Sequence, residues 1–145
     1  AYRVPLIFRW PGRITAGIES AEPVSSIDFF PTFQALTEQE PSRDQELDGI
    51  NILPLLLSQQ PLDREALYWH YPHYHHGGAS PHGIIRKGPY RLIEHFDGTQ
   101  AELYNIENDI GETVNLIYSM PEKSKERNLD NQALEKDFNS QKDSN

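Results

Sequence analysis

The sequence has no cysteine, no run of basic residues and no long apolar stretch, and each absence excludes a class of protein. Without cysteine there are no disulfides, no thiolate metal ligands and no thiol nucleophile. The 13 lysines and arginines are outnumbered by 22 aspartates and glutamates, and the resulting net charge of -9 argues against nucleic acid as a partner. No apolar run approaches the ~18–20 residues of a membrane span, so a membrane is not an expected partner either.

One segment differs in charge from the rest of this acidic chain. Residues 66–93 contain no aspartate or glutamate, although Arg86, Lys87 and Arg91 lie there. Cations and imidazole N–H groups attract an anion and carboxylates repel it, so this composition is expected where an anion approaches the protein. All 6 histidines lie within this segment or just after it, namely His70, His73, His75, His76, His82 and His95.

The first part of the chain opens with a short apolar run, residues 4–8, that ends in a Trp-Pro-Gly turn. A run without polar alternation indicates a strand that is buried on both faces. A strand needs neighbours to pair its backbone N–H and C=O groups, and the sequence offers no other parallel strand. We therefore expect this part of the chain to be the closing piece of a larger α/β domain.

Two helices are expected next. Residues 25–36 begin with possible caps at Ser26 and Asp28, and we interpret Asp28 as a cap rather than as a catalytic acid. Residues 51–57 are apolar nearly all round, which indicates a short buried helix with Pro54 in its first turn. The expected apolar face of the first helix consists of Phe29, Phe33 and Leu36.

The second half predicts an antiparallel sheet of about four strands, because strand-forming residues alternate with Gly-containing turns. Residues 73–81 form a Gly-rich loop between the first two strands, and Arg86 and Arg91 are expected on a solvated face of the sheet. The dipeptide Asp97-Gly98 indicates a hairpin turn. A final helix is expected to start near Ser119, and the polar tail, residues 140–145, to be frayed.

Several short motifs occur in order along the chain, at residues 3–12, 23–32, 47–56, 67–74, 83–88, 90–94 and 102–105. Taken together, they resemble segments of type I sulfatases of the alkaline-phosphatase-like superfamily. The resemblance implies part of an α/β fold, in which residues 1–62 end the large domain. Residues 63–145 would form the C-terminal subdomain, an antiparallel sheet with a terminal helix.

The resemblance implies an arylsulfatase-like sulfuric ester hydrolase that acts on sulfated carbohydrates or aryl sulfates. The family's formylglycine is made from cysteine or serine in a Cys/Ser-x-Pro-Ser-Arg motif, and both this motif and the calcium ligands lie upstream of the matching region. Residues 39–43 have the Pro-Ser-Arg part, but Gln39 cannot be oxidised to the aldehyde. We therefore expect no catalytic residue and no metal ligand here, an inactive chain when alone, and the missing N-terminal part of the large domain as its partner.

Members of this family are usually exported, so the resemblance implies a periplasmic or secreted protein. The chain begins with Ala1 and shows no signal peptide, from which we expect that processing or cutting made this N-terminus.

In sulfatases the small subdomain lies beside the substrate pocket. The resemblance therefore implies substrate contact by the Gly-rich loop between the first two strands, which we call the histidine-rich loop. Gly77 and Gly78 allow a close approach, and imidazole can donate to sulfate or hydroxyl oxygens near neutral pH. A purely structural role in loop packing and a zinc or nickel site remain open as alternatives. The residues expected to contact substrate are His70, His73, His75 and His76.

Two further functions stay open at this point. The chain can be a non-enzymatic module that holds a sulfated glycan or a metal ion in the histidine-rich loop. It can also be a structural remnant without a ligand. Calorimetry with sulfated glycans and, separately, with zinc distinguishes these hypotheses from one another.

Overall fold

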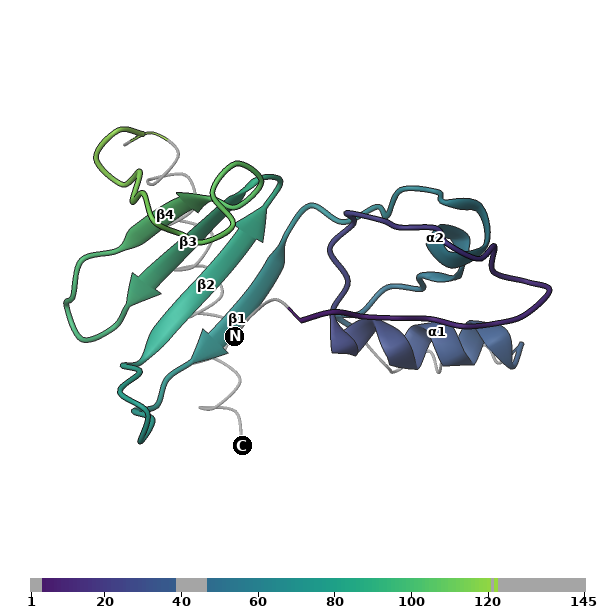
Figure 1. Cartoon of the computed structure of the whole chain (residues 1–145). Helices are drawn as coiled ribbons and strands as arrows, with labels where there is room; N and C mark the ends of the chain where they lie inside the picture. Colours follow the sequence, from purple (N-terminus) through teal and green to yellow (C-terminus); the bar gives the residue numbers. More distant parts are fainter. Residues whose placement is uncertain (1–3, 39–46, 121, 123–145) are drawn as a thin grey trace, which may run out of the picture. The chain divides into compact units, whose positions relative to one another are not determined.

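Two compact units, Ala1–Asp63 and Arg64–Asn145, divide the chain, and we call them the helical unit and the sheet unit (Figure 1). The computed structural model describes residues 4–38, 47–120 and 122. Residues 39–43, part of the expected final helix and the polar tail therefore lie outside the described residues. Among the described helices, none combines the length and the apolar character that crossing a membrane requires.

The helical unit contains a short 3-10 turn, η1 (Ser26–Asp28), followed by α1 (Phe29–Leu36) and, after the gap, α2 (Leu53–Ser58). Both helices expected from the sequence are confirmed. Pro31 lies in the first turn of α1 and Pro54 in the first turn of α2, where a missing backbone N–H removes no helical hydrogen bond.

A buried carboxylate joins η1 to the segment before α2. The Asp28 side chain is completely buried and accepts hydrogen bonds from the backbone N–H groups of Ser25, at 2.8 Å, and of Ile50, at 3.0 Å. One turn later, the buried Thr32 hydroxyl donates to the Asp28 carbonyl and accepts from the Ile52 N–H. Asp28 therefore closes the capping box at the start of η1, makes no side-chain cap hydrogen bond to α1, and clamps two segments together.

Gly49 shows how closely these two segments approach. A Cβ atom built on Gly49 would lie 2.0 Å from the carbonyl oxygen of Ile27. Contacts this short do not occur between real atoms, and the partner is backbone that cannot swing away. Glycine is required here because the segment passes directly against η1.

The expected buried strand at residues 4–8 is wrong for this chain. The described residues of the helical unit form no strand, and Val4 and Ile7 are 72% and 86% exposed. The physical reason is that the described residues of this unit provide no neighbouring strand with which the backbone of residues 4–8 could pair. Phe8 is half-buried, and its ring packs edge-to-face on Phe29 with the ring centroids 6.0 Å apart.

The face of α1 that was expected to be buried, with Phe33 and Leu36, is largely exposed. Phe33 is 58% exposed and Leu36 is 37% exposed, whereas Asp28 and Thr32 point inward. In the described part of the helical unit, many large apolar side chains are therefore open to solvent. They include Val4, Leu6, Ile7, Trp10, Ile18, Ile27, Phe30, Phe33, Leu36 and Leu57.

The sheet unit is an antiparallel sheet of four strands in the order β1-β2-β3-β4, as predicted (Figure 1). The strands are β1 (Leu67–Tyr71), β2 (His82–Lys87), β3 (Tyr90–His95) and β4 (Glu102–Asn105). The register places His82 opposite His95 at one end of β2 and Arg86 opposite Arg91 at the other end. Tyr71 lies opposite His82, so three aromatic or imidazole side chains line up across β1, β2 and β3 on one face.

The main core cluster of this unit lies on one face of the sheet, and Ile84 on the opposite face is also completely buried. Ile85, Leu92 and Leu103 form the cluster and are completely buried. The segment after β4 covers them: the Leu116 N–H donates to the Leu103 carbonyl at 2.7 Å, and the Leu103 N–H donates to the Asn115 side chain. The partly buried residues packed against this cluster are Ala66, Tyr90, Ala101, Leu116, Ile117 and Met120.

Candidate functional site

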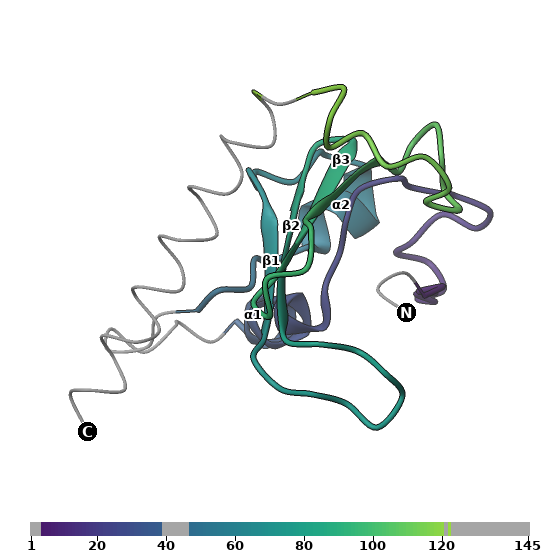
Figure 2. The same ribbon diagram turned by 90° about the vertical axis from the view of Figure 1, so that its left-hand side faces the viewer.

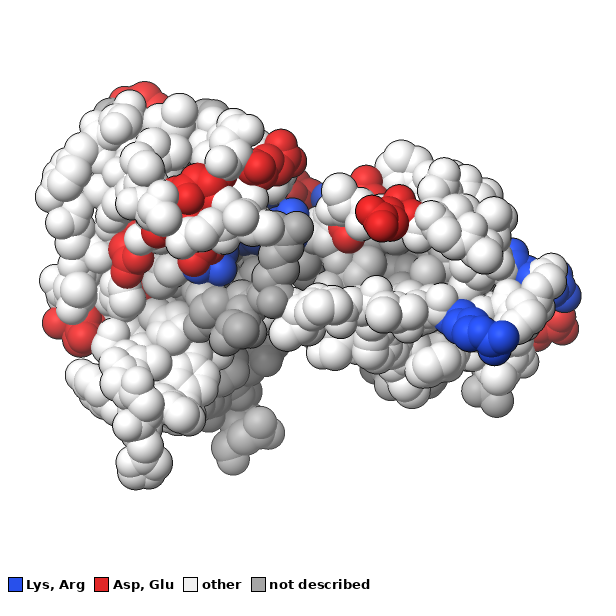
Figure 3. Space-filling view, viewed as in Figure 1, with Lys and Arg blue, Asp and Glu red and all other residues white. Residues whose placement is uncertain are grey.

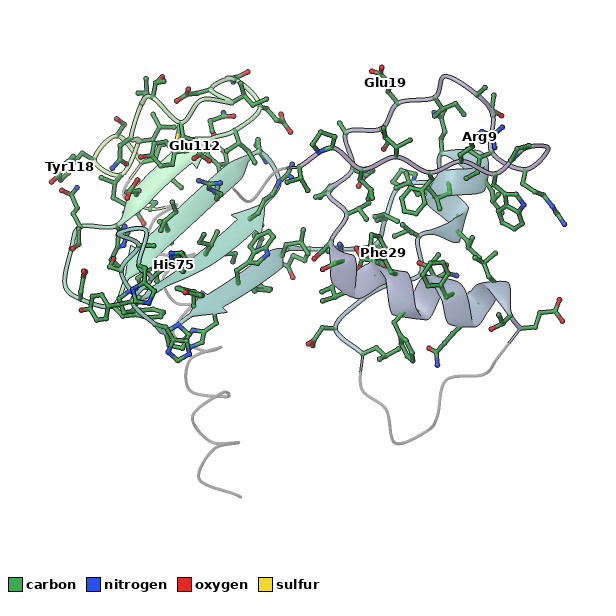
Figure 4. The ribbon with its side chains drawn as sticks, turned by 60° about the horizontal axis from the view of Figure 1, so that its bottom comes forward. Arg9, Glu19, Phe29, His75, Glu112 and Tyr118 are labelled. Carbon is green, nitrogen blue, oxygen red and sulfur yellow. The ribbon has the colours of Figure 1, made fainter. Side chains whose placement is uncertain are left out.

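The histidine-rich loop, residues 72–81, connects β1 to β2 and extends beyond the end of the sheet (Figure 2). Three of the four predicted site residues, His73, His75 and His76, lie in this loop and are exposed. Figure 4 shows His75 at this end of the sheet unit. His70 lies on β1 instead, with its ring 5.3 Å from the ring of Phe96. The structure therefore groups three of the predicted residues and places the fourth on the adjoining strand.

Hydrogen bonds fold the tip of the loop into a tight turn. The His75 N–H donates to the Ala79 carbonyl at 3.0 Å, and the Gly78 N–H donates to the His75 carbonyl at 2.9 Å. Gly78 has a φ of 89°, which an L side chain rarely adopts. The Gly77 N–H donates to His75 Nδ1 at 2.9 Å, so the neutral His75 ring carries its proton on Nε2, where it is a hydrogen-bond donor.

The loop histidines pair with rings rather than with carboxylates. The rings of His75 and His76 have centroids 6.5 Å apart, and His73 packs edge-on against Tyr71 at 6.0 Å. Among the described residues, no three histidine, aspartate or glutamate side chains lie close enough together to hold a metal ion. A zinc or nickel site of the kind considered from the sequence therefore has no preformed ligand set in this part of the chain.

A second group of side chains, which the sequence analysis did not single out, lies at the base of the loop. His82 is buried, and its Nδ1 lies 2.6 Å from the Ser80 carbonyl oxygen. His95 lies beside it, with Nδ1 3.1 Å from Ser80 Oγ and Nε2 2.9 Å from Glu102 Oε1. Tyr104 donates its hydroxyl to the other oxygen of Glu102 at 2.5 Å. We call Ser80, His82, His95, Glu102 and Tyr104 the base cluster.

The base cluster perturbs the titration of two of its members. Burial raises the pKa of Glu102, but the hydrogen bonds from Tyr104 and His95 outweigh it, and the net shift is downward. The hydrogen bond to Glu102, with burial, raises the pKa of Tyr104 to about 12. Strand alternation was the signal that could have revealed this cluster, because His82, His95, Glu102 and Tyr104 all occupy positions on one face of the sheet.

Two cations of the carboxylate-free segment, Lys87 and Arg91, are paired with carboxylates from outside it. Lys87 Nζ lies 2.5 Å from Glu65, and Arg91 forms an ion pair with Glu112. The Arg91 side chain is only 12% exposed, so the expectation that it lines a solvated face is wrong. Folding brings Glu112 over the sheet from the segment after β4, which the sequence alone does not show. In the space-filling view the basic side chains of the sheet unit lie among acidic ones (Figure 3).

Comparison with known proteins identifies the family to which this fold belongs. Residues 1–140 match the family described as N-sulphoglucosamine sulphohydrolase, C-terminal. A sulfatase of Formosa agariphila is 36% identical over 129 residues, which cover 82% of this chain and 23% of that protein. Human N-acetylgalactosamine-6-sulfatase is 40% identical over 67 residues, covering 46% of this chain and 13% of that protein.

Among solved structures, BT4656 in complex with its substrate D-glucosamine-2-N,6-O-disulfate superposes with a TM-score of 0.68 and 31% identity, over 97% of this chain and 29% of that one. Ps i-CgsB, solved with a neocarrahexaose, gives a TM-score of 0.70 and 25% identity, over 85% of this chain and 27% of that one.

The chain belongs to the N-sulphoglucosamine sulphohydrolase C-terminal family. Its four-stranded sheet is that of the C-terminal subdomain of the α/β sulfatase fold, as the resemblance implied. It spans about a quarter of the length of the sulfatase of Formosa agariphila.

Proposed function

We propose that this chain is the C-terminal part of a sulfatase that hydrolyses sulfate esters of carbohydrates. Its family membership supports the reaction class, and the sulfated sugar bound to the similar structure BT4656 supports the substrate class. In this proposal Ala1–Asp63 ends the large domain and the sheet unit is the small subdomain. Export to the periplasm or the medium forms part of the same proposal.

The chemistry that breaks the ester belongs to another part of such a protein. A formylglycine cannot form here, since the chain has no cysteine and no Ser-x-Pro-Ser-Arg sequence. The described residues offer no group of acidic or histidine side chains suited to calcium. Neither the formylglycine nor the calcium ion therefore fits the residues of this chain, and the chain alone is expected to be inactive.

The exposed apolar side chains of the helical unit support the rest of the large domain as a partner. Val4, Ile7 and Phe33 are each more than half exposed. Removing apolar surface from water contributes about 25 cal/mol per Å², so covering these side chains stabilises the covered state. A large exposed apolar surface of this kind is typical of a buried interface.

The proposed substrate contacts are His70, His73, His75 and His76. The observation that carries this assignment is the turn at residues 75–79, which is exposed and free of carboxylates, and in which the neutral His75 ring keeps its proton on Nε2. An imidazole N–H that donates to a sulfate oxygen forms a hydrogen bond to a charged group, worth about 1.5–3 kcal/mol.

The test uses the full-length protein that contains this chain, with D-glucosamine-2-N,6-O-disulfate as the probe. Replacing His75 and His76 by alanine is expected to raise KM about tenfold or more with kcat little changed, because only binding contacts are removed. Tyr118→Ala serves as the control, since Tyr118 is 82% exposed and lies outside the loop. An unchanged KM in the histidine variant contradicts the assigned contacts, and absence of desulfation by the wild type contradicts the proposed activity on this sugar.

A further inference from the structure

The exposed histidine-rich loop is fixed to the sheet at one end by three hydrogen bonds. His82 Nδ1 lies 2.6 Å from the Ser80 carbonyl oxygen, and the Phe96 N–H donates to the Pro81 carbonyl at 2.8 Å. Ser80 Oγ lies 3.1 Å from His95 Nδ1. Pro81 and His82 are buried, whereas residues 73–79 are exposed, so the position of the loop is determined at this stem.

Glu102 decides which nitrogen of His95 carries the proton. An ionised carboxylate only accepts hydrogen bonds, so the His95 Nε2 that lies 2.9 Å from Glu102 must be the donor. In the neutral ring Nδ1 is then an acceptor for the Ser80 hydroxyl, and the Asp97 carboxylate is a second acceptor for the same hydroxyl. Tyr104 holds the second oxygen of Glu102, which fixes the carboxylate and, with it, the plane of the imidazole.

A short path leads from Ser80 to the tip of the loop. Ser80 follows Ala79 directly, and the Ala79 carbonyl accepts the His75 N–H at 3.0 Å. On the other side, Tyr71 contacts the rings of both His82 and His73, with centroids 5.6 Å and 6.0 Å apart. A shift of Ser80 therefore moves the turn that presents His75.

We propose that His95 is a positioning residue for sulfated-sugar recognition, and that it acts through Ser80 to hold the loop turn in its binding shape. His95 needs no contact with the ligand itself, since Glu102 and Tyr104 orient its ring and Ser80 transmits its effect. This proposal rests on the proposed function of the loop histidines and adds the group that fixes them.

Two conservative variants separate the two sides of the His95 ring. In His95→Asn the side-chain amide lies where Nδ1 was and retains a partner for Ser80. In His95→Gln the amide reaches the place of Nε2, which retains the contact with Glu102 and loses Ser80. Ser80→Ala removes the same contact from the other side.

The first measurement is amide hydrogen exchange at His75 and Gly78, followed by NMR on the 145-residue chain. Exchange at both amides is expected to accelerate about fivefold to tenfold in His95→Gln and in Ser80→Ala, the loss that corresponds to one hydrogen bond. The double variant should exchange no faster than either single variant, because both remove the same contact. His95→Asn is expected to stay close to wild type.

The core amide of Ile85 reports whether each variant is folded, and its exchange should be unchanged. Equal acceleration in His95→Asn and His95→Gln would overturn the proposal, because it would indicate a general loosening of the sheet. Unchanged exchange at His75 in Ser80→Ala would overturn it as well.

A titration with D-glucosamine-2-N,6-O-disulfate supplies the second measurement. Its affinity, read from shifts of the loop resonances, is expected to fall about fivefold to tenfold in His95→Gln and Ser80→Ala and to be retained in His95→Asn. Absence of any shift in the wild type counts against the loop histidines as contacts. Exchange at His75 decides the positioning role independently of that result.

Discussion

The Asp28 clamp gives the sharpest prediction about stability. Asp28→Asn keeps one acceptor oxygen and places an NH₂ group against the second of the two backbone N–H groups that the carboxylate binds. One hydrogen bond to a charged group is lost, and a buried donor faces another donor. We expect a cost of about 2–4 kcal/mol in the free energy of unfolding of the helical unit.

Native-state amide exchange measures this cost locally. The Ile50 N–H binds Asp28 Oδ1 and the Ile52 N–H binds Thr32 Oγ1, so both amides report on the clamp. Their exchange is expected to accelerate roughly 30-fold or more, since 1.4 kcal/mol corresponds to a factor of ten.

Asp63→Asn is the matched control, because it makes the same change of charge at an exposed position of the same unit. Its effect on these amides should stay within about threefold. If both variants accelerated exchange equally, the effect would come from net charge and the clamp would have no special role. If neither did, the buried hydrogen bonds would contribute nothing measurable.

Two further predictions concern the same structure. Gly49→Ala should destabilise the helical unit strongly, because its Cβ would lie 2.0 Å from the Ile27 carbonyl oxygen. Gly111→Ala is the control, because its Cβ meets only an ordinary contact at 3.4 Å. Thermal melts should show a lower melting temperature for Gly49→Ala than for Gly111→Ala. Glu102 has a lowered pKa and Tyr104 a pKa of about 12, so their mutual stabilisation should be lost as the pH falls below about 4.5 and as it rises from 10 toward 12. Absorbance titration of tyrosinate checks the upper limit: Tyr104→Phe should remove a late-titrating group, and a titration identical to wild type would contradict the assignment.

Local patterns predicted the elements of the sheet unit well. Strand-forming runs and glycine turns indicated four antiparallel strands, and all four are present. The Asp97-Gly98 dipeptide lies in the turn between β3 and β4, as predicted, but this loop is longer than a two-residue hairpin loop. Such a loop forms because the Thr99 N–H donates to the Asp97 side chain at 2.9 Å, which adds a local turn.

Contacts between distant residues could not be read from the sequence. Glu112 is 21 residues from Arg91, and only the fold brings the two side chains together. Strand alternation places the members of the base cluster on one face, but only the register of β2 and β3 makes His82 and His95 neighbours. For residues 4–8 the sequence pattern predicted a buried strand, but in this chain the segment is largely exposed because the described residues do not cover most of its apolar side chains.

The exposed run at residues 4–8 has a practical consequence for anyone producing this chain. This segment is apolar, rich in strand-forming residues and not paired with a strand. A second chain can therefore add a strand to it. The net charge of -9 opposes such association, and salt weakens that repulsion. Concentrated samples in high salt should therefore precipitate first, and a lysine in place of Ile7, which is 86% exposed, should delay it.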